Sequence, residues 1–373
     1  MGKRAEVSKC RVIVAAIVAR AHPSRYNAGL VASALRFSAY SLPSYHAELD
    51  GPPGPFMRNT VNLLASAEPL GFDGIWLNEH HFHPWGGMIP SPPIMLSALA
   101  QRTQRVTLGT SIVVLPLHNP IQVAEEVAML DLMSKGRVQL GVGRGSLAVD
   151  YEDMGLSYGD AQERLIDGLE LMLKGFQGQR FSHDGPFYKV DGIEIWPPVV
   201  QKPHPPVWIS CSNNPASFEW TAKRGYNLLT IAFPKPVDKL AALTRVYRDA
   251  WQQPAPYEIG TLYHTVVAES SARARELATG AFRNFYYELH AARRGHATPL
   301  FSSIQDLDVD TIIEDRRLVA GNPEEVAAML TSLQGEIGFT QAILMFQLGG
   351  LSFDVARESM ELFSAEVMPR LRS

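Results

Sequence analysis

The sequence has little cysteine, no long apolar run and no dense block of one charge. Two cysteines, Cys10 and Cys211, among 373 residues are too few for a disulfide framework or a cysteine zinc site. No run approaches the roughly 20 apolar residues that a transmembrane helix needs. The net charge of −4, without a Lys/Arg-rich block, argues against a nucleic-acid partner. We therefore expect a globular, cytoplasmic protein with neither a membrane nor a nucleic-acid partner.

The N-terminus, "MGKRAEVSKCRVIVAAIVARAH", allows two interpretations. Basic residues precede an apolar stretch from Val12 to Ala19, and "ARA" follows, which is the outline of a secretory signal peptide. The first convincing core strand comes later, at "LRFSAY", which favours a loose extension or a misassigned start codon. We predict that residues 1–33 are a loosely ordered extension and that residues 34–373 form one domain.

Strand-like and helix-like segments alternate along that domain. Strands are predicted at 35–40, 73–78, 105–115, 137–143, 205–211, 226–232, 258–268 and 341–348. Helices are predicted at about 56–70, 92–103, 119–136, 160–176, from 215, 236–252, 271–289, from 322 and 353–370. Alternation implies a parallel sheet, and eight units favour an α/β fold of the (β/α)8 TIM barrel type. An open, doubly wound sheet is the alternative.

Two segments do not fit the alternation. Residues 177–205 are rich in proline and are predicted to be an insertion on the barrel. Residues 291–318 have no clear period and are a candidate mobile loop. If the fold is a barrel, its functional residues lie at the carboxyl ends of the strands and in the loops that follow them.

The second predicted strand ends in "NEHHFH", one acid and three histidines within five residues. Because side chains alternate along a strand, Ile75 and Leu77 are expected to pack outward, which turns His80 toward the barrel mouth. The direction of His81 stays open, and His83 is expected in the loop. The histidines lack the i, i+4 spacing of a helical zinc motif, so we predict no metal site. A single acid–base histidine fits better, because its pKa lies near neutral pH.

Small residues occupy inward positions on the next two strands, among them Gly109, Ser111, Gly141 and Gly143. They leave a slot for a flat ligand, unless bulky residues from opposite strands fill it. Arg144 in "GVGRGS" suits a phosphate or a planar anionic edge, although a surface ion pair is an equal alternative. After the fifth strand, an asparagine of "CSNNPASFEW" either binds an anion at a helix N-terminus or simply caps that helix.

Several blocks together identify a resemblance. "GFDGIWLNEHHFHPWG", "RVTLGTSIVVLPLHNPIQVAEEVAMLDLMSKGRVQLGVGRG" and "FEWTAKRGY" resemble the bacterial-luciferase-like flavin-dependent monooxygenases, and the similarity extends over roughly residues 35 to 371. The resemblance implies a barrel that binds reduced FMN from a separate flavin reductase. Oxygen would add at flavin C4a, and the peroxyflavin would oxidise a small organic substrate such as an aldehyde. It also implies a dimer, expected here to be a homodimer.

The resemblance carries over to named positions. His80 matches the catalytic histidine, and Glu79 and His81 complete that motif. Ser111 and Ile112 match a pair joined by a non-proline cis peptide beside the flavin ring. The other matched positions contact the cofactor or its phosphate: Gly143, Arg144, Arg164, Asn213, Asn214 and Ser217.

The sequence also departs from luciferase. Luciferase has a cysteine at the position of Gly143, and its phosphate-binding segment begins Glu-Ser at the position of Asn213 and Asn214. The first departure argues against bioluminescence, whereas the second leaves phosphate binding in place because amides can donate. Two alternatives stay open, a deazaflavin-dependent reductase or dehydrogenase on the same barrel and a catalytically silent flavin-binding relative. The sequence does not identify the substrate.

Overall fold

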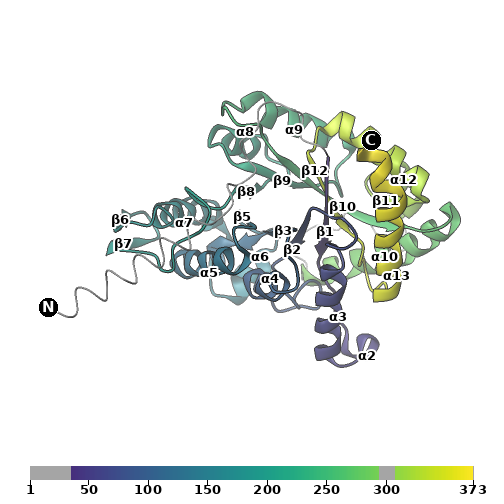
Figure 1. Cartoon of the computed structure of the whole chain (residues 1–373), viewed down its shortest axis with the longest axis horizontal. Helices are drawn as coiled ribbons and strands as arrows, with labels where there is room; N and C mark the ends of the chain where they lie inside the picture. Colours follow the sequence, from purple (N-terminus) through teal and green to yellow (C-terminus); the bar gives the residue numbers. More distant parts are fainter. Residues whose placement is uncertain (1–34, 294–306, 373) are drawn as a thin grey trace.

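The computed structural model describes residues 35–293 and 307–372 (Figure 1). The predicted extension 1–33 lies outside these residues, as does most of the candidate loop 291–318. The mobility of that loop stays a prediction, and its described part contains helix α11 (Val309–Glu314). Its N-cap is Asp308, whose side chain accepts a hydrogen bond from the Thr311 amide.

Eight parallel strands close into a barrel, as predicted (Figure 1). In order around the barrel they are β1 (Arg36–Ser41), β2 (Gly74–Leu77), β3 (Thr107–Thr110), β5 (Val138–Gly143), β8 (Val207–Ser210), β9 (Asn227–Ile231), β10 (Ile259–Val267) and β12 (Gln341–Met345). The barrel closes because β10 pairs with β9 on one side and with β12 on the other, while β12 pairs with β1. The open-sheet alternative is therefore wrong.

Helices surround the barrel. They are α3 (Pro53–Ala65), α4 (Pro92–Ala100), α5 (Pro120–Ser134), α7 (Ala161–Gly175), α8 (Pro215–Lys223), α9 (Val237–Ala250), α10 (Ser271–Ala292), α12 (Pro323–Ile337), α13 (Phe353–Leu362) and α14 (Met368–Arg372). Asn119 caps α5, and Asn322 forms a capping box with Glu325 at the start of α12. A π-helical turn over Phe363–Val367 interrupts the last predicted helix. None of the helices in the described residues combines the length and apolarity needed to cross a bilayer.

Short elements account for most differences from the prediction. α2 (Ala47–Asp50), α6 (Ala148–Asp153), β4 (Val113–Val114) and β11 (Val319–Gly321) have too few residues to produce a recognisable period. The predicted insertion contains β6 (Phe181–Asp184) and β7 (Lys189–Ile193), an antiparallel hairpin separate from the barrel sheet and seen beside α7 in Figure 1. The insertion therefore decorates the barrel without changing its closure.

The predicted strand 105–115 is divided. β3 ends at Thr110, a cis peptide bond joins Ser111 to Ile112, and β4 resumes pairing with β5. This is the non-proline cis peptide that the resemblance implied. The division turns the chain at the carboxyl end of β3, where the site residues lie.

The barrel interior holds two large rings rather than a deep slot. A Cβ at Gly109 would lie 2.2 Å from the Trp76 indole, and Trp76 packs edge-to-face against Trp208 with ring centroids 5.2 Å apart. A Cβ at Gly141 would lie 1.9 Å from the Thr110 carbonyl oxygen, so this glycine allows β5 to approach β3. Bulky residues thus fill the barrel at this depth, and any ligand site must lie closer to the mouth.

The alternation predicted for β2 is confirmed. Ile75 and Leu77 belong to the outer core between sheet and helices, whereas Trp76 belongs to the inner cluster. Cys211 is a buried thiol, as expected, and burial raises its pKa to about 12 despite a hydrogen bond with Thr221. The outer core holds the strands in place and the inner cluster supports the barrel mouth.

Candidate active site

The loop after β2 is fixed to the loop after β1. The Asn78 side chain donates to the Gly86 carbonyl at 2.9 Å, and the Gly86 amide donates to Pro43 at 3.2 Å. Gly86 has a left-handed φ of +74°, and a Cβ there would lie 2.8 Å from His80 Cδ2. Glycine at this position therefore lets the loop fold tightly over the His80 ring.

His80, His83 and Asp150 form one cluster, called here the Asp150 cluster. His80 Nδ1 lies 3.9 Å from Asp150 Oδ2, and His83 Nε2 lies 3.5 Å from Asp150 Oδ1. All three side chains are buried, with 14%, 6% and 6% of their surfaces exposed respectively. His80 Nδ1, both ring nitrogens of His83 and Asp150 Oδ1 have no hydrogen-bond partner. These separations are longer than ordinary hydrogen bonds and too short to hold a water between the facing atoms, so the three groups face one another without short hydrogen bonds.

Burial and charge act against each other in this cluster. Burial lowers the pKa of His80, although the facing Asp150 carboxylate opposes that shift. Burial alone would raise the pKa of Asp150, but the interactions with His80 and His83 outweigh it and lower that pKa to about 2. Near neutral pH the arrangement is thus an ionised Asp150 facing a neutral His80, the state in which His80 can accept a proton.

Glu79, His81 and His118 form a second cluster, called here the Glu79 cluster. Glu79 Oε1 accepts hydrogen bonds from His81 Nε2 at 3.0 Å and from His118 Nε2 at 2.7 Å. Its other oxygen, Oε2, accepts from the Val114 amide of β4 at 3.1 Å. Glu79 is only 3% exposed, and both of its oxygens are bonded. The cluster therefore links β2, β4 and the turn after β4 through one carboxylate.

Hydrogen bonds dominate the electrostatics of the Glu79 cluster. Burial alone would raise the pKa of Glu79, but the hydrogen bonds from His118 and His81 lower it below its usual value. Burial alone would lower the pKa of His118, and its bond to Glu79 raises it instead. The pair is therefore most stable as carboxylate and imidazolium.

Each cluster brings three potential metal ligands within 4.8 Å of one another. The prediction that no metal binds here rested only on the spacing of the three histidines that follow β2. His80 and His81 do diverge, but His83 lies with His80, and each cluster gains a partner from a distant segment, Asp150 in one and His118 in the other. In the Glu79 cluster hydrogen bonds already occupy the carboxylate. The absence of a metal stays a prediction.

Ser111, Ile112 and Gly143 lie together at the carboxyl ends of β3 and β5. A Cβ at Gly143 would lie 2.5 Å from Ile112 Cδ1 and 3.2 Å from Ser210 Cβ. Ser111 and Ile112 are partly exposed, and the Ser111 amide donates to the Leu77 carbonyl at 2.6 Å. The cis peptide is thus held between β2 and β5 with one side accessible.

Two arginines follow β5. The Arg144 guanidinium is exposed, stacks on the Tyr158 ring at 5.1 Å and has no acidic partner within ion-pair distance among the described residues. The backbone carbonyl of Arg144 accepts a hydrogen bond from the Tyr151 hydroxyl at 2.6 Å, which connects Arg144 to α6. Arg164, on α7, lies over the Phe187 ring at 4.6 Å, and its buried Nε has no hydrogen-bond partner. Both cations are therefore available to an anion.

The segment after β8 begins helix α8. Asn214 is the N-cap, because its side chain accepts from the Ala216 amide at 3.1 Å, and its carbonyl accepts from Ser217. Asn213 is exposed and Ser217 is partly exposed. Because β8 pairs with β5, these residues and Arg144 lie at neighbouring strand ends. Capping is confirmed for Asn214. Pro215 has no N–H and the amides of Ala216 and Ser217 bond to Asn214, so the side chains of Asn213 and Ser217 are the groups that this turn leaves for an anion.

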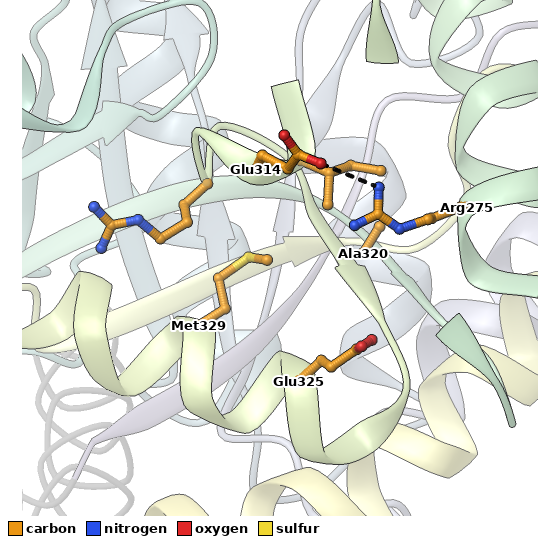
Figure 2. Close-up of a pocket in the computed structure, with 7 residues that line it drawn as sticks. Arg275, Glu314, Ala320, Glu325 and Met329 are labelled. Carbon is orange, nitrogen blue, oxygen red and sulfur yellow. Dashed lines mark ion pairs between the residues drawn. The ribbon is translucent and has the colours of Figure 1, made fainter. Parts of the chain in front are cut away.

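A surface depression of about 230 Å³ lies elsewhere, between α10, α11 and α12 (Figure 2). Figure 2 shows Arg275 and Glu314 pointing toward each other across it, at 4.0 Å, and Arg275 also pairs with Asp310 at 2.7 Å. Glu325 is used by the capping box of α12. Ion pairs thus engage Arg275 and Arg316, the capping box engages Glu325, and neither a histidine nor a nucleophile is among the described residues that line the depression.

Sequence reasoning missed Asp150, His118 and the burial of His83. Asp150 lies in a six-residue helix after "GVGRGS", and His118 follows β4 in the "LPLHNP" turn. Neither forms a motif with the β2 histidines, because the barrel alone brings these segments together. Their places at carboxyl ends of strands were the available indication. Lys235 was also missed; it is buried, donates to the Ile231 carbonyl, and burial lowers its pKa to about 8.

The chain resembles characterised oxygenases along most of its length. It is 28% identical over 322 residues to the oxygenase component of flavin-dependent trigonelline monooxygenase from Acinetobacter baylyi, covering 83% of this chain and 88% of that protein. It is 26% identical to the solved monooxygenase RslO1 from Streptomyces bottropensis, with a TM-score of 0.82 over 90% of this chain and 99% of that one.

Two more distant structures share the fold. The oxygenating constituent of 3,6-diketocamphane monooxygenase from Pseudomonas putida, solved in complex with FMN, has a TM-score of 0.76 at 18% identity, covering 90% and 98% of the two chains. An F420-dependent secondary alcohol dehydrogenase has a TM-score of 0.67 at 17% identity, covering 91% and 100%. The family model of luciferase-like monooxygenases matches residues 36–341, and the chain therefore belongs to this family of flavin-dependent monooxygenases.

Proposed function

We propose that the protein is an FMN-dependent monooxygenase that uses O2 to oxidise a small organic substrate such as an aldehyde. Reduced FMN would come from a separate flavin reductase, in keeping with the name of the trigonelline relative, an oxygenase component. The observation that carries the proposal is that His80, just after β2, and Arg144 and Arg164, after β5, all lie beyond carboxyl ends of barrel strands, and neither arginine has an acidic partner among the described residues.

The residues at the strand ends fit FMN. Arg144, Arg164 and the polar side chains at the start of α8 would hold the phosphate, because the two arginines offer donors and positive charge and have no acidic partner among the described residues. Asn213, Asn214 and Ser217 add polar groups to the same site. Ser111, Ile112 and Gly143 would lie against the flavin ring, where the accessible side of the cis peptide offers a flat surface.

Bound reduced FMN supplies the electrons and the carbon centre at which O2 reacts. The protein's part is to control protons and water around that centre. His80 is neutral because of burial and faces Asp150, so it can accept or return a proton at its ring while the Asp150 carboxylate stabilises the protonated form. Trp85, whose ring centroid is 4.4 Å from that of His80, covers the histidine and limits access of water.

Glu79 and His81, which the resemblance places in the catalytic motif, would act by positioning. Their cluster is fully hydrogen-bonded, and Glu79 Oε2 holds the Val114 amide just beyond the cis peptide. Through this bond the Glu79 cluster fixes the chain on which the flavin ring would rest. His81 would therefore affect turnover through geometry and not through proton transfer.

The test combines cofactor binding with oxygen chemistry. Anaerobic titration with reduced FMN and with a reduced deazaflavin identifies the cofactor, and addition of O2 with a panel of small substrates then identifies the product. Binding of FMN followed by oxygen incorporation supports the proposal. Preference for the deazaflavin and hydride transfer without oxygen would point to the reductase alternative. Flavin binding without oxygen uptake or product would indicate a silent relative.

We also propose a homodimer. Neighbouring helices α4 and α5 carry apolar side chains that are unusually exposed, Ile94 at 72% and Met129 at 51%. Leu132 and Met133 on α5 are each 39% exposed. Such a patch on a soluble chain favours an interface. Light scattering should give twice the chain mass for the wild-type protein and the chain mass for the variant carrying both Ile94→Glu and Met129→Glu.

A further inference from the structure

A cavity of about 290 Å³ opens beside the Asp150 cluster, close to the lower end of the roughly 300–1,000 Å³ typical of small-molecule sites. It lies between the loop after β2 and the C-terminal part of α10. Its lining consists of Phe82, His83, Pro84 and Trp85 from the loop, His46, and Tyr287, Glu288, Ala291 and Ala292 from α10. The cavity and the proposed flavin site share a wall, because His83 pairs with Asp150 and Trp85 contacts His80.

Aromatic rings dominate this lining. Phe82 and Tyr287 are 58% and 59% exposed, which is unusual for large rings, and Trp85 forms the buried side of the cavity. Phe82 has a left-handed φ of +61°, a conformation that bulky residues rarely adopt without a functional reason. Exposed aromatic rings around a cavity can bind apolar ring systems, and the faces of the rings can bind cations.

The charge in the cavity is negative. Glu288 Oε1 pairs with His46 Nε2 at 2.8 Å, whereas Glu288 Oε2 is buried and has no hydrogen-bond partner. Behind the wall lies the Asp150 carboxylate, paired with His83. No Lys or Arg belongs to the lining within the described residues. A buried carboxylate oxygen without a donor is costly, so a ligand that brings a cation or a donor gains that energy.

We infer that this cavity is the subsite for a substrate that carries a cationic nitrogen on or beside an apolar ring. The nitrogen would lie near Glu288 Oε2 among the three rings, and the apolar part would extend along Pro84, Ala291 and Ala292. Trp85 Nε1 and His83 Nδ1, neither of which has a hydrogen-bond partner, can bond to a polar group on the same ligand. The inference rests on the proposed function only in calling the ligand a substrate.

The experiment compares benzyltrimethylammonium with its uncharged carbon isostere, 2,2-dimethylpropylbenzene, by isothermal titration calorimetry on the full chain. We expect the cation to bind at least about tenfold more tightly, because ring faces and a desolvated carboxylate both favour it. Glu288→Gln should reduce that preference at least about threefold. Glu276→Gln, on the same helix but outside the lining and 71% exposed, should leave it unchanged. Equal affinities in the wild-type protein, or an unchanged preference in Glu288→Gln, overturn the inference.

A second variant tests the inference even if the Glu288→Gln protein fails to fold. Tyr287→Leu removes an exposed ring and keeps the carboxylate, so it should weaken the cation several-fold more than the isostere, and equal weakening contradicts a cation site. Titration with reduced FMN on the same samples separates this subsite from the proposed function. Normal FMN binding without a preference for the cation would contradict only the proposed subsite. A preference for the cation without FMN binding would contradict only the proposed monooxygenase function. In the FMN-loaded protein the cation should change the rate of flavin reoxidation by O2, and no change overturns its assignment as a substrate subsite.

Discussion

Two histidine–carboxylate clusters flank the end of β2, and the consecutive residues Glu79, His80 and His81, just after that strand, contribute to both. In the Glu79 cluster two imidazoles donate to one carboxylate oxygen at 3.0 and 2.7 Å, and a backbone amide takes the other oxygen. In the Asp150 cluster the corresponding distances are 3.9 and 3.5 Å, and several nitrogens have no partner. The residue types are the same, yet one network is complete and the other is open.

This difference indicates that one cluster has a structural role and that the other takes part in the reaction. A complete network fixes its members, because any movement leaves a buried charge without its bonds. An open network costs stability, and proteins keep such groups where protons move or ligands bind. We therefore assign structural support of the cis peptide to the Glu79 cluster and proton handling to the Asp150 cluster. The predictions below test this assignment, beginning with the largest expected effect.

His80→Ala should lower product formation by about 10²- to 10⁴-fold, because it removes the only proposed acid–base group that faces the barrel mouth. The affinity for reduced FMN should change little, since the proposed phosphate-binding residues lie after β5, on α7 and at the start of α8. Rapid-mixing kinetics and anaerobic titration measure the two quantities. His204→Ala, in the segment before β8, is the matched control. Near-normal turnover in the His80 variant would show that the Asp150 cluster takes no part in the reaction.

Glu79→Gln should destabilise the fold by about 2–3 kcal/mol, because an amide cannot accept from all three donors and leaves at least one buried donor unpaired. Urea unfolding measures this loss, and Glu276→Gln on the exposed surface should stay within about 0.5 kcal/mol of wild type. Turnover per folded molecule should fall far less than in the His80 variant. A loss of turnover as large as that of His80→Ala, without loss of stability, would reverse the two assignments.

Asp150→Asn should lower turnover by about 10- to 100-fold, because the protonated ring of His80 loses the carboxylate that stabilises it. The pKa of His80 should fall further, since the Asp150 carboxylate is what opposes the effect of burial. NMR titration of the His80 ring distinguishes this from a packing defect, which would leave the pKa unchanged. Stability should change less than in Glu79→Gln, because Asp150 makes no short hydrogen bond with either histidine.

The same contrast explains what the sequence could predict. Alternation along β2 placed Ile75 and Leu77 outward and turned His80 inward, because strand geometry is local. The partners Asp150 and His118 depend on how the barrel brings distant segments together, and no local pattern contains that information. The slot inferred from Gly109 was wrong for the same reason, since its space is filled by Trp76 from the neighbouring strand.

We also expect the Glu79 cluster to make the free energy of unfolding depend on pH, which is the smallest of the predicted effects. The folded pKa of Glu79 lies below its unfolded value near ~4.3, so its contribution is present above that pH and is lost as pH falls through the folded pKa. The folded pKa of His118 lies above its unfolded value near ~6.5, so its contribution is full below ~6.5 and is lost as pH rises through the folded pKa. The stability difference between wild type and Glu79→Gln should therefore be largest between about pH 4.3 and 6.5 and should narrow on both sides. Urea unfolding of both proteins across pH 3.5 to about 8.5 measures it, and a difference that keeps growing above neutral pH would show that His118 does not carry the charge assigned to it.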